Sequence, residues 1–253
     1  MARQSFRKRR PETSPQGDVL CGLNPVLELL HASPTLIEKL YLVPALQNGE
    51  RIAAEARGLG IGVEITDRSV LDQMTGSAHH QGVAARTKPF AFMAIEDLLQ
   101  ATPPLLVVLD GITDPQNLGA IVRSAEVLGA GGVVVPKDRS VGVTPTVIRA
   151  SSGAAIHLPI VQVVNLVRAL EQIKESGYWI IGLDAAGTSK FQDLPTFELA
   201  SIVIGGEGKG MRPLVARSCD FTVSIPVRGR VSSLNAGAAA AIGIHEIRSR
   251  LSS

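Results

Sequence analysis

The sequence predicts an α/β protein with a parallel sheet in its C-terminal part and a smaller α/β unit before it. Residues 105–109 form a continuous apolar run, as in a strand that is buried on both faces of a sheet. Towards the C-terminus, two apolar strands at residues 202–204 and 221–225 each lead into a loop of small residues. Because glycine lets backbone atoms touch a ligand, these loops predict a ligand crevice at the carboxyl edge of the sheet.

Length and composition restrict the class of protein. The chain has 253 residues, 45% of them hydrophobic and 19% charged, which fits one large globular domain or two modest ones. No apolar run reaches the roughly 18 residues that a membrane-spanning helix needs. Basic residues near the N-terminus are not followed by an apolar segment, so no secretory signal is predicted and we expect a cytoplasmic protein. The net charge of +2 permits an anionic partner.

The cysteines and a histidine pair do not predict a metal site. Cys21 and Cys219 lie far apart in the sequence, and we expect buried thiols at both positions. His79 and His80 are adjacent, and adjacent side chains of a strand point to opposite faces. With no cysteine or third histidine beside them, a loop role is favoured over metal ligation.

The first 104 residues divide into three segments. Residues 1–16 are rich in Arg, Pro and Ser and predict a disordered arm, which either increases solubility or contacts nucleic-acid phosphates. Residues 17–88 predict a small α/β domain, with Asn24 as N-cap and Pro25 as first residue of its first helix. Its later elements are a strand at 39–43, a helix at 50–59, a strand at 62–65, a helix at 68–74 and a strand at 82–87. Residues 89–104, with three prolines and a short helix at 95–100, predict a linker.

The larger domain is expected over residues 105–253. A helix at 118–128 carries an apolar stripe that must face the sheet, and Arg123 lies roughly 140° from Leu118. Read alone, Arg123 is a solvated arginine. The remaining expected elements are a strand at 132–135, a helix that starts at Thr144 and Pro145, a strand at 156–160, a helix at 165–175 and a strand at 178–183. Together they predict a sheet of five or six strands.

The first glycine loop, residues 205–210, does not fit the common nucleotide-binding motifs. A Walker loop requires Ser or Thr after its lysine, whereas Lys209 is followed by Gly210. A Rossmann fingerprint requires a third glycine where Met211 stands. Glu207 would repel a pyrophosphate but is compatible with a positive or zwitterionic ligand. The alternative is a glycine-rich turn with a solvated Glu207.

The second loop precedes an unusual terminal helix. Ser232 or Ser233 is expected to cap a helix that begins near Ala236. Residues 236–244 are small on nearly every face, which predicts that other backbone packs very close all round this helix.

Three segments, in this order, resemble the SpoU/TrmH class of SPOUT RNA methyltransferases. They are residues 114–124, 204–211 and 225–235. The N-terminal half is similar to the substrate-binding domain of that family at residues 22–26 and 80–83. Within the family, the chain most resembles the enzymes that methylate a guanosine ribose 2′-oxygen in bacterial large-subunit rRNA.

The resemblance implies a fold, a cofactor and an assembly. The C-terminal domain would be tied as a deep trefoil knot, an exception to the rule that chains do not thread their loops. S-adenosylmethionine would lie bent in this knot, held by the segments that contain Gly205, Gly206, Ile225, Pro226 and Leu234. Two copies would form a homodimer through their C-terminal domains.

The resemblance also implies residue roles. Asn117 and Glu207 would hold the loops and Arg123 in place, and Ser233 and Asn235 would order the third loop. Arg123 would reach the partner's site and stabilise a developing alkoxide, because a guanidinium stays protonated in proteins. The implied activity is methylation of a guanosine ribose in 23S rRNA. A tRNA ribose methyltransferase of the same fold and a non-catalytic RNA-binding assembly factor are the alternatives, and a dinucleotide oxidoreductase lacks its fingerprint.

Overall fold

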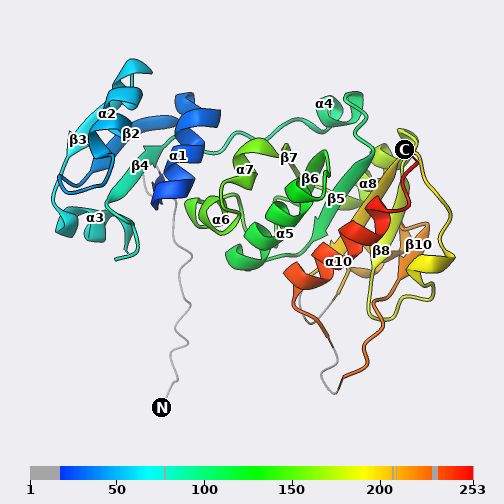
Figure 1. Ribbon diagram of the computed structural model, residues 1–253. Helices are drawn as coiled ribbons and strands as arrows, with labels where there is room; N and C mark the ends of the chain where they lie inside the picture. The colour runs from blue at the N-terminus through cyan, green and yellow to red at the C-terminus, as the bar shows by residue number, and fades with distance from the viewer. Residues whose placement is uncertain (1–17, 77, 207, 209, 230–232, 253) are drawn as a thin grey trace, which may run out of the picture.

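The computed structural model describes residues 18–252 except 77, 207, 209 and 230–232. Figure 1 shows two halves, a smaller one with the N-terminal strands and a larger one with the remaining strands, connected by an extended segment that contains helix α4 (Ile95–Gln100). None of the helices in the described ranges has the length and hydropathy of a membrane span.

The smaller half contains a mixed sheet with the strand order β1-β4-β2-β3. Strands β1 and β2 pair antiparallel to β4, whereas β3 pairs parallel to β2. Its strands are β1 (Asp18–Cys21), β2 (Ile37–Leu42), β3 (Gly62–Ile65) and β4 (Val83–Thr87), and its helices are α1 (Leu23–Ala32), η1 (Pro34–Leu36), α2 (Gly49–Gly58) and α3 (Arg68–Thr75). The predicted order of elements from residue 24 to residue 87 is therefore confirmed, with β1 added before it and η1 added between α1 and β2.

The start of α1 differs from the prediction. The N-cap is Gly22, with φ 103°, and Asn24 already lies inside the helix. The Oε1 atom of Gln81 accepts a hydrogen bond from the Leu23 N–H at 2.8 Å. A side chain 58 positions away thus satisfies one of the free N–H groups at this helix end, which a local capping rule does not foresee.

The larger half contains six described strands that are all parallel, in the order β10-β8-β9-β5-β6-β7. They are β5 (Leu105–Asp110), β6 (Gly132–Pro136), β7 (Ile160–Val163), β8 (Trp179–Leu183), β9 (Ala200–Gly205) and β10 (Phe221–Val223). A sheet of five or six strands was predicted, and the larger number is confirmed. Every residue of β5 is buried, as the continuous apolar run predicted.

Helices cover both faces of this sheet, so that the larger half has three layers. Successive residues of β5 alternate between two apolar clusters, because neighbouring side chains of a strand point to opposite faces. Leu105 and Val107 share one cluster with residues of α5 (Pro115–Val127) and α10 (Ala236–Arg248). Leu106 and Val108 share the other with residues of α8 (Leu166–Glu175) and α9 (Pro213–Arg217). The helices that complete the larger half are α6 (Pro145–Ala150), α7 (Ala154–His157) and η2 (Phe191–Asp193).

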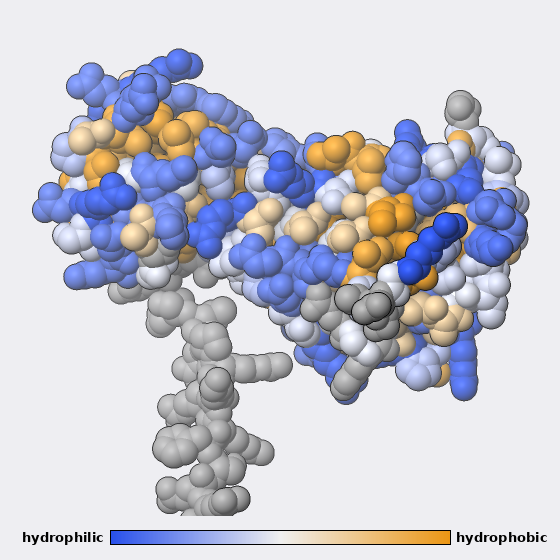
Figure 2. All heavy atoms as spheres, turned by 60° about the horizontal axis from the view of Figure 1, so that its bottom comes forward, coloured by the Kyte–Doolittle hydropathy of each residue, from blue (hydrophilic) through white to orange (hydrophobic). Residues whose placement is uncertain are grey.

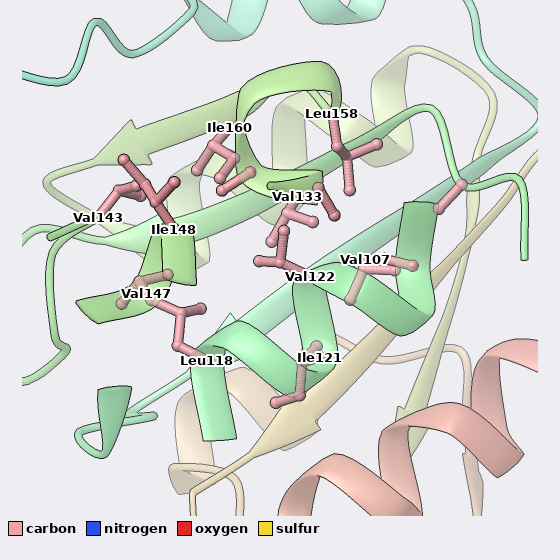
Figure 3. Packing of buried hydrophobic residues seen from close by; sticks show 14 of the residues in the cluster. Val107, Leu118, Ile121, Val122, Val133, Val143, Val147, Ile148, Leu158 and Ile160 are labelled. Atoms are coloured by element: carbon pink, nitrogen blue, oxygen red, sulfur yellow. The ribbon is translucent and has the colours of Figure 1, made fainter. Parts of the chain in front are cut away.

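Helix α5 buries the apolar stripe that the sequence predicted. Leu118, Ile121, Val122 and Ala125 are fully buried. Figure 3 shows Val122 close to Val133 of β6 and Leu118 close to the side chains of α6. The helix begins three residues earlier than predicted, because the Asp114 side chain accepts a hydrogen bond from the Gln116 N–H and caps it.

The predicted strand at residues 156–160 is wrong. Residues Ala154–His157 form the short helix α7, and strand β7 begins only at Ile160. Gly153, with φ 89°, starts the turn, and the Oγ of Ser151 accepts a hydrogen bond from the Ala155 N–H. A short apolar run does not distinguish a strand from a buried helix by its period, which is why the prediction failed.

The two halves contact each other through α1 and the α6–α7 region. The Nε2 of His157 lies 3.0 Å from the Oε2 of Glu28, and a Cβ on Gly153 would lie 2.8 Å from the Glu28 side chain. Leu29 and Ile148 belong to one apolar cluster that continues across this contact. The smaller half therefore packs against the part of the larger half that contains α6 and α7 (Figure 1).

Candidate functional site

A cavity with a volume of ≈ 690 Å³ lies at the carboxyl edge of the larger sheet. Strand ends, the loop after β9 and the segment before α10 contribute to its wall. The lining residues are Leu183, Asp184, Ala185, Ile204, Gly205, Gly206, Gly208, Gly210, Ile225, Val227, Ser233, Leu234, Asn235, Ala236 and Ala239. The crevice that the two small-residue loops predicted is present, and its volume is in the range of small-molecule sites.

The described residues of the first loop that line the cavity are all glycines, held in a tight turn. The N–H of Gly206 donates to the Asp110 carbonyl at 2.9 Å, and the N–H of Gly210 donates to the Gly206 carbonyl at 3.1 Å. A Cβ on Gly205 would collide with the carbonyl carbon of Gly210, and one on Gly206 would collide with the Gly111 carbonyl oxygen. Only glycine allows the two chain segments to approach this closely.

An ion pair holds the far end of the same loop. The Asp110 side chain has no exposed surface, and its Oδ1 lies 2.6 Å from the Nε of Arg212. Its Oδ2 accepts a hydrogen bond from the Arg212 backbone N–H at 2.7 Å. Asp110 thus connects the end of β5 to both ends of the loop, through its carbonyl at Gly206 and its carboxylate at Arg212.

The second wall begins with an asparagine pair. The Nδ2 of Asn235 donates to the Oδ1 of Asn117 at 2.8 Å, and the Oδ1 of Asn235 accepts from the N–H groups of Gly237 and Ala238. Asn235 is therefore the N-cap of α10, and the expectation that Ser232 or Ser233 caps this helix is wrong for Ser233. The pair ties the start of α10 to α5, because Asn117 lies in α5, where it is buried.

Helix α10 packs closely on two sides and is open on a third. A Cβ on Gly237 would lie 3.0 Å from the Cβ of Ala120, and one on Gly243 would lie 2.7 Å from Ile202. Ala238 and Ile242 are exposed, however. Within a single chain, the expectation of close backbone contact all round the helix is therefore wrong, because one side of α10 is exposed.

The structure brings together some of the predicted site residues and separates others. Gly205, Gly206, Ile225 and Leu234 line the cavity, as do Ser233 and Asn235, whereas Pro226 is not among its lining residues. Asn117 reaches the site through Asn235. Arg123 lies on the exposed side of α5 and does not line the cavity of its own chain. Glu207 and Ser232 lie outside the described residues.

Two residues that matter at this edge were missed by the sequence analysis. Asp184 lines the cavity immediately after β8, and a carboxylate directly after a buried parallel strand is a signal that could have found it. Arg212 was missed because it reaches Asp110 across 102 positions of sequence, a separation at which single-sequence patterns carry no information.

The titratable groups near the sheet do not suggest a nucleophile or a metal site. Burial raises the pKa of the Cys219 thiol to about 12, so it is protonated at neutral pH. Cys21 is buried, whereas Cys219 is only partly so.

His80 is fully buried, accepts a hydrogen bond from the Gly82 N–H and contacts Asp72, which is a structural role in a loop. Among the residues that the structure describes, no group of three potential metal ligands occurs.

An all-parallel sheet with a cavity at its carboxyl edge defines the class of α/β proteins that bind a ligand at strand ends. Within that class, the sequence profile of the SpoU rRNA Methylase family matches residues 104–245, and a profile described as RNA 2'-O ribose methyltransferase substrate binding matches residues 19–93. The chain belongs to the SpoU rRNA methylase family.

Individual relatives agree with this assignment. A protein of Bacillus subtilis named putative TrmH family tRNA/rRNA methyltransferase YacO is 39% identical over 92% of this chain and 96% of its own length. The 23S rRNA (guanosine-2'-O-)-methyltransferase RlmB of Shewanella oneidensis is 39% identical over 93% and 98%. The solved structure of the SpoU methyltransferase AviRb from Streptomyces viridochromogenes in complex with AdoMet is 26% identical, covers 91% and 89% of the two chains and superposes with a TM-score of 0.77.

Proposed function

We propose that this protein transfers a methyl group from S-adenosylmethionine to the ribose 2′-oxygen of a guanosine in 23S rRNA. The observation that carries the proposal is the cavity between the two small-residue loops, with the Asn117–Asn235 pair at its edge. Family membership gives the reaction class, and the relative from Shewanella oneidensis, named for this reaction and similar over nearly its whole length, supports the choice of substrate.

The cavity fits S-adenosylmethionine. Ile204, Ile225 and Leu234 provide apolar surface for the adenine ring, and the glycines of the first loop that line the cavity add no side chain of their own in front of the backbone. Asp184, Ser233 and Asn235 provide polar atoms for the ribose and the zwitterionic tail. Of the expected set, Gly205, Gly206, Ile225 and Leu234 would hold the cofactor in the cavity, and Pro226 would act through the backbone between Ile225 and Val227. When bound, the cofactor supplies an electrophilic methyl carbon attached to a positively charged sulfur.

The chain's own residues would prepare the attacking oxygen. Arg123 would stabilise negative charge on the ribose 2′-oxygen as its proton passes to solvent water, since a guanidinium remains protonated and acts by its charge. Asn117 and Asn235 would fix the start of α5 and α10 beside the cavity, and Ser233 would order the segment between them. Glu207 would complete the first loop.

Arg123 requires a second subunit in this proposal. It stands roughly 9 Å along α5 from Asn117, at about 1.5 Å per residue, and is exposed. We propose a homodimer in which α5 and α10 of two chains meet, so that Arg123 reaches the partner's cavity. Support comes from exposed apolar residues on these helices, Val127 at 71% and Ile242 at 40%. Figure 2 shows apolar residues gathered on the surface of the larger half.

The remaining expectations about the chain are part of the same proposal. Residues 17–88 would bind the RNA substrate, residues 89–104 would link this domain to the methyltransferase domain at 105–253, and the basic arm at 1–16 would contact phosphates. The C-terminal domain would be tied as a deep trefoil knot. An enzyme of this kind would act in the cytoplasm, where ribosomal RNA is made in bacteria.

Mapping of ribose methylation in total RNA tests the function. Cells that lack the protein should lose one 2′-O-methyl mark at a guanosine of 23S rRNA, and a copy of the gene should restore it. Loss of a tRNA mark would instead support a tRNA ribose methyltransferase. An unchanged methylation pattern, together with no binding of S-adenosylmethionine by calorimetry, would support a non-catalytic RNA-binding factor.

A further inference from the structure

Asp184 is a carboxylate in the wall of the cavity, and the group of the cofactor that it would bind follows from its geometry. It follows directly after β8, at the carboxyl edge of the sheet, and is partly exposed. Among the described residues that line the cavity, it is the single ionisable side chain. The other lining residues are glycines, apolar residues and the neutral polar residues Ser233 and Asn235.

Backbone hydrogen bonds fix the orientation of this carboxylate. The Oδ1 of Asp184 accepts from the N–H of Ala186 at 2.8 Å, and its carbonyl accepts from the N–H of Gly187 at 3.0 Å. The backbone N–H of Asp184 donates to the Val223 carbonyl at 2.9 Å. A Cβ on Gly187 would collide with the backbone of Val223, so the turn is pressed against β10. The side chain is thereby held in one place by its own turn.

The second carboxylate oxygen points across the cavity wall towards the glycine loop. The Oδ2 of Asp184 lies 3.3 Å from the position that a Cβ on Gly210 would take. Within the described part of the chain, no donor is within hydrogen-bonding distance of this oxygen. Towards the described residues it therefore presents unpaired lone pairs, in a fixed direction, beside Gly210, which has no side chain to obstruct a ligand.

We propose that Asp184 accepts hydrogen bonds from the 2′- and 3′-hydroxyl groups of the adenosyl ribose and so determines the affinity for the cofactor. This inference rests on the proposed function. Hydroxyl donors suit a fixed oxygen because hydrogen bonds are directional, whereas attraction to the sulfonium or the ammonium group needs no fixed orientation. Acidic side chains after strands of doubly wound sheets bind ribose hydroxyls in the same manner.

Calorimetry with the full-length protein tests the inference directly. We would measure the affinity of wild type, Asp184→Asn and Asp184→Ala for S-adenosylmethionine, for S-adenosylhomocysteine and for the 2′,3′-dideoxyribose analogue of the latter. Asn keeps an acceptor for the Ala186 N–H and so preserves the turn. Asp138→Asn makes the same charge change on an exposed residue that does not line the cavity, and it serves as the control.

Asp184→Ala should bind both natural ligands roughly 10- to 100-fold more weakly, as expected for lost hydrogen bonds to a charged group. The dideoxy analogue should bind wild type and Asp184→Ala equally, because the interaction is already missing. Asp138→Asn should bind as wild type does. Asp184→Asn should lie between wild type and Asp184→Ala.

Two results would overturn the inference while leaving the proposed function intact. One is unchanged affinity of both Asp184 variants. The other is a loss for S-adenosylmethionine only, which would mean that the carboxylate recognises the sulfonium charge. If wild type binds neither natural ligand, the proposed function itself fails, and that result is separate from the effect of any variant.

Discussion

At the scale of single residues, the pair Asp110 and Arg212 has the clearest energetic consequence. The Asp110 carboxylate is fully buried, whereas the Arg212 side chain is 43% exposed. Removal of the arginine leaves a buried charge with a backbone N–H as its remaining described partner. Breaking a buried pair in this way is strongly destabilising, whereas exposed ion pairs contribute little.

Arg212→Ala should therefore lower the free energy of unfolding by about 2 to 4 kcal/mol, less than for a fully buried pair because the guanidinium is partly solvated. Urea denaturation would measure the change. Arg217→Ala is a suitable control, since it removes an arginine from the nearby helix α9 without a described carboxylate partner. Equal stability of Arg212→Ala and wild type would show that the pair does not support the loop.

A second residue-scale consequence concerns the glycine loop. A Cβ on Gly205 would collide with the backbone of Gly210, whereas one on Gly142 would meet no atom within 4 Å. Gly205→Ala should abolish binding of S-adenosylmethionine, because the loop must move into or away from the cavity, and Gly142→Ala should bind normally. Calorimetry would compare the two variants. Normal binding by Gly205→Ala would show that the loop adapts and that close approach is not required.

At the scale of elements, helices α5 and α10 form a layer with one buried side and one open side. Ile242 of α10 is 40% exposed, and Val164, which precedes α8, is 79% exposed. If the open side is the dimer interface, Ile242→Glu places a charge in an apolar contact and should shift the protein to monomers. Val164→Glu changes a more exposed apolar residue at another surface and should leave the assembly unchanged.

Sedimentation at several protein concentrations would measure both variants. Because burial of an unpaired charge costs several kcal/mol, the dissociation constant of Ile242→Glu should rise by at least about 100-fold. A monomeric wild type, or a dimer that both variants leave intact, would exclude this face as the interface.

Sequence patterns predicted most elements because the strands are strongly apolar and the helices are periodic. Every residue of β5 is buried, and the stripe of α5 faces the sheet as its spacing required. One failure lies where a partner distant in sequence decides the structure, because Gln81 provides the hydrogen-bond partner at the start of α1. The other is the short apolar run that forms α7 instead of a strand, since its period does not distinguish the two.

At the candidate site, too, local features were predicted from the sequence and contacts between distant residues were not. Strand ends and glycines placed the cavity correctly, because both are local features that determine where a parallel sheet opens. The cap of α10 was assigned to a serine, although Asn235 both caps the helix and reaches Asn117 across 118 positions. Asp184 directly follows the buried strand β8, a local signal that was overlooked, but the packing of its turn against Val223 of another strand could not be predicted. Contacts of this range depend on the fold, not on local pattern.

At the scale of the whole molecule, the position of Arg123 separates two kinds of enzyme. If a chain uses its own Arg123, each subunit is complete. If the arginine crosses to the partner, each site combines the cavity of one chain with α5 of the other. The exposure of Arg123 and its absence from the lining of its own cavity favour the second arrangement.

Mixed dimers distinguish the two arrangements. Arg123→Ala should abolish methyl transfer with cofactor binding nearly intact, and Ala239→Phe should block the cavity from α10, because Ala239 lines it. Each variant alone should be inactive. A dimer of one Arg123→Ala chain and one Ala239→Phe chain should recover about half the wild-type rate, since one of its two sites then has an open cavity and an intact arginine from the partner.

Differently tagged chains, co-expressed and purified in two affinity steps, give the mixed dimer for the assay. A dimer that carries both changes on one chain and none on the other is the matched control. If Arg123 acts in the partner's site, this control dimer has no complete site, because its one open cavity would receive the altered residue 123 of the other chain. The control dimer should then be inactive. The opposite result, an inactive mixed dimer and a half-active control, would place Arg123 in the site of its own chain.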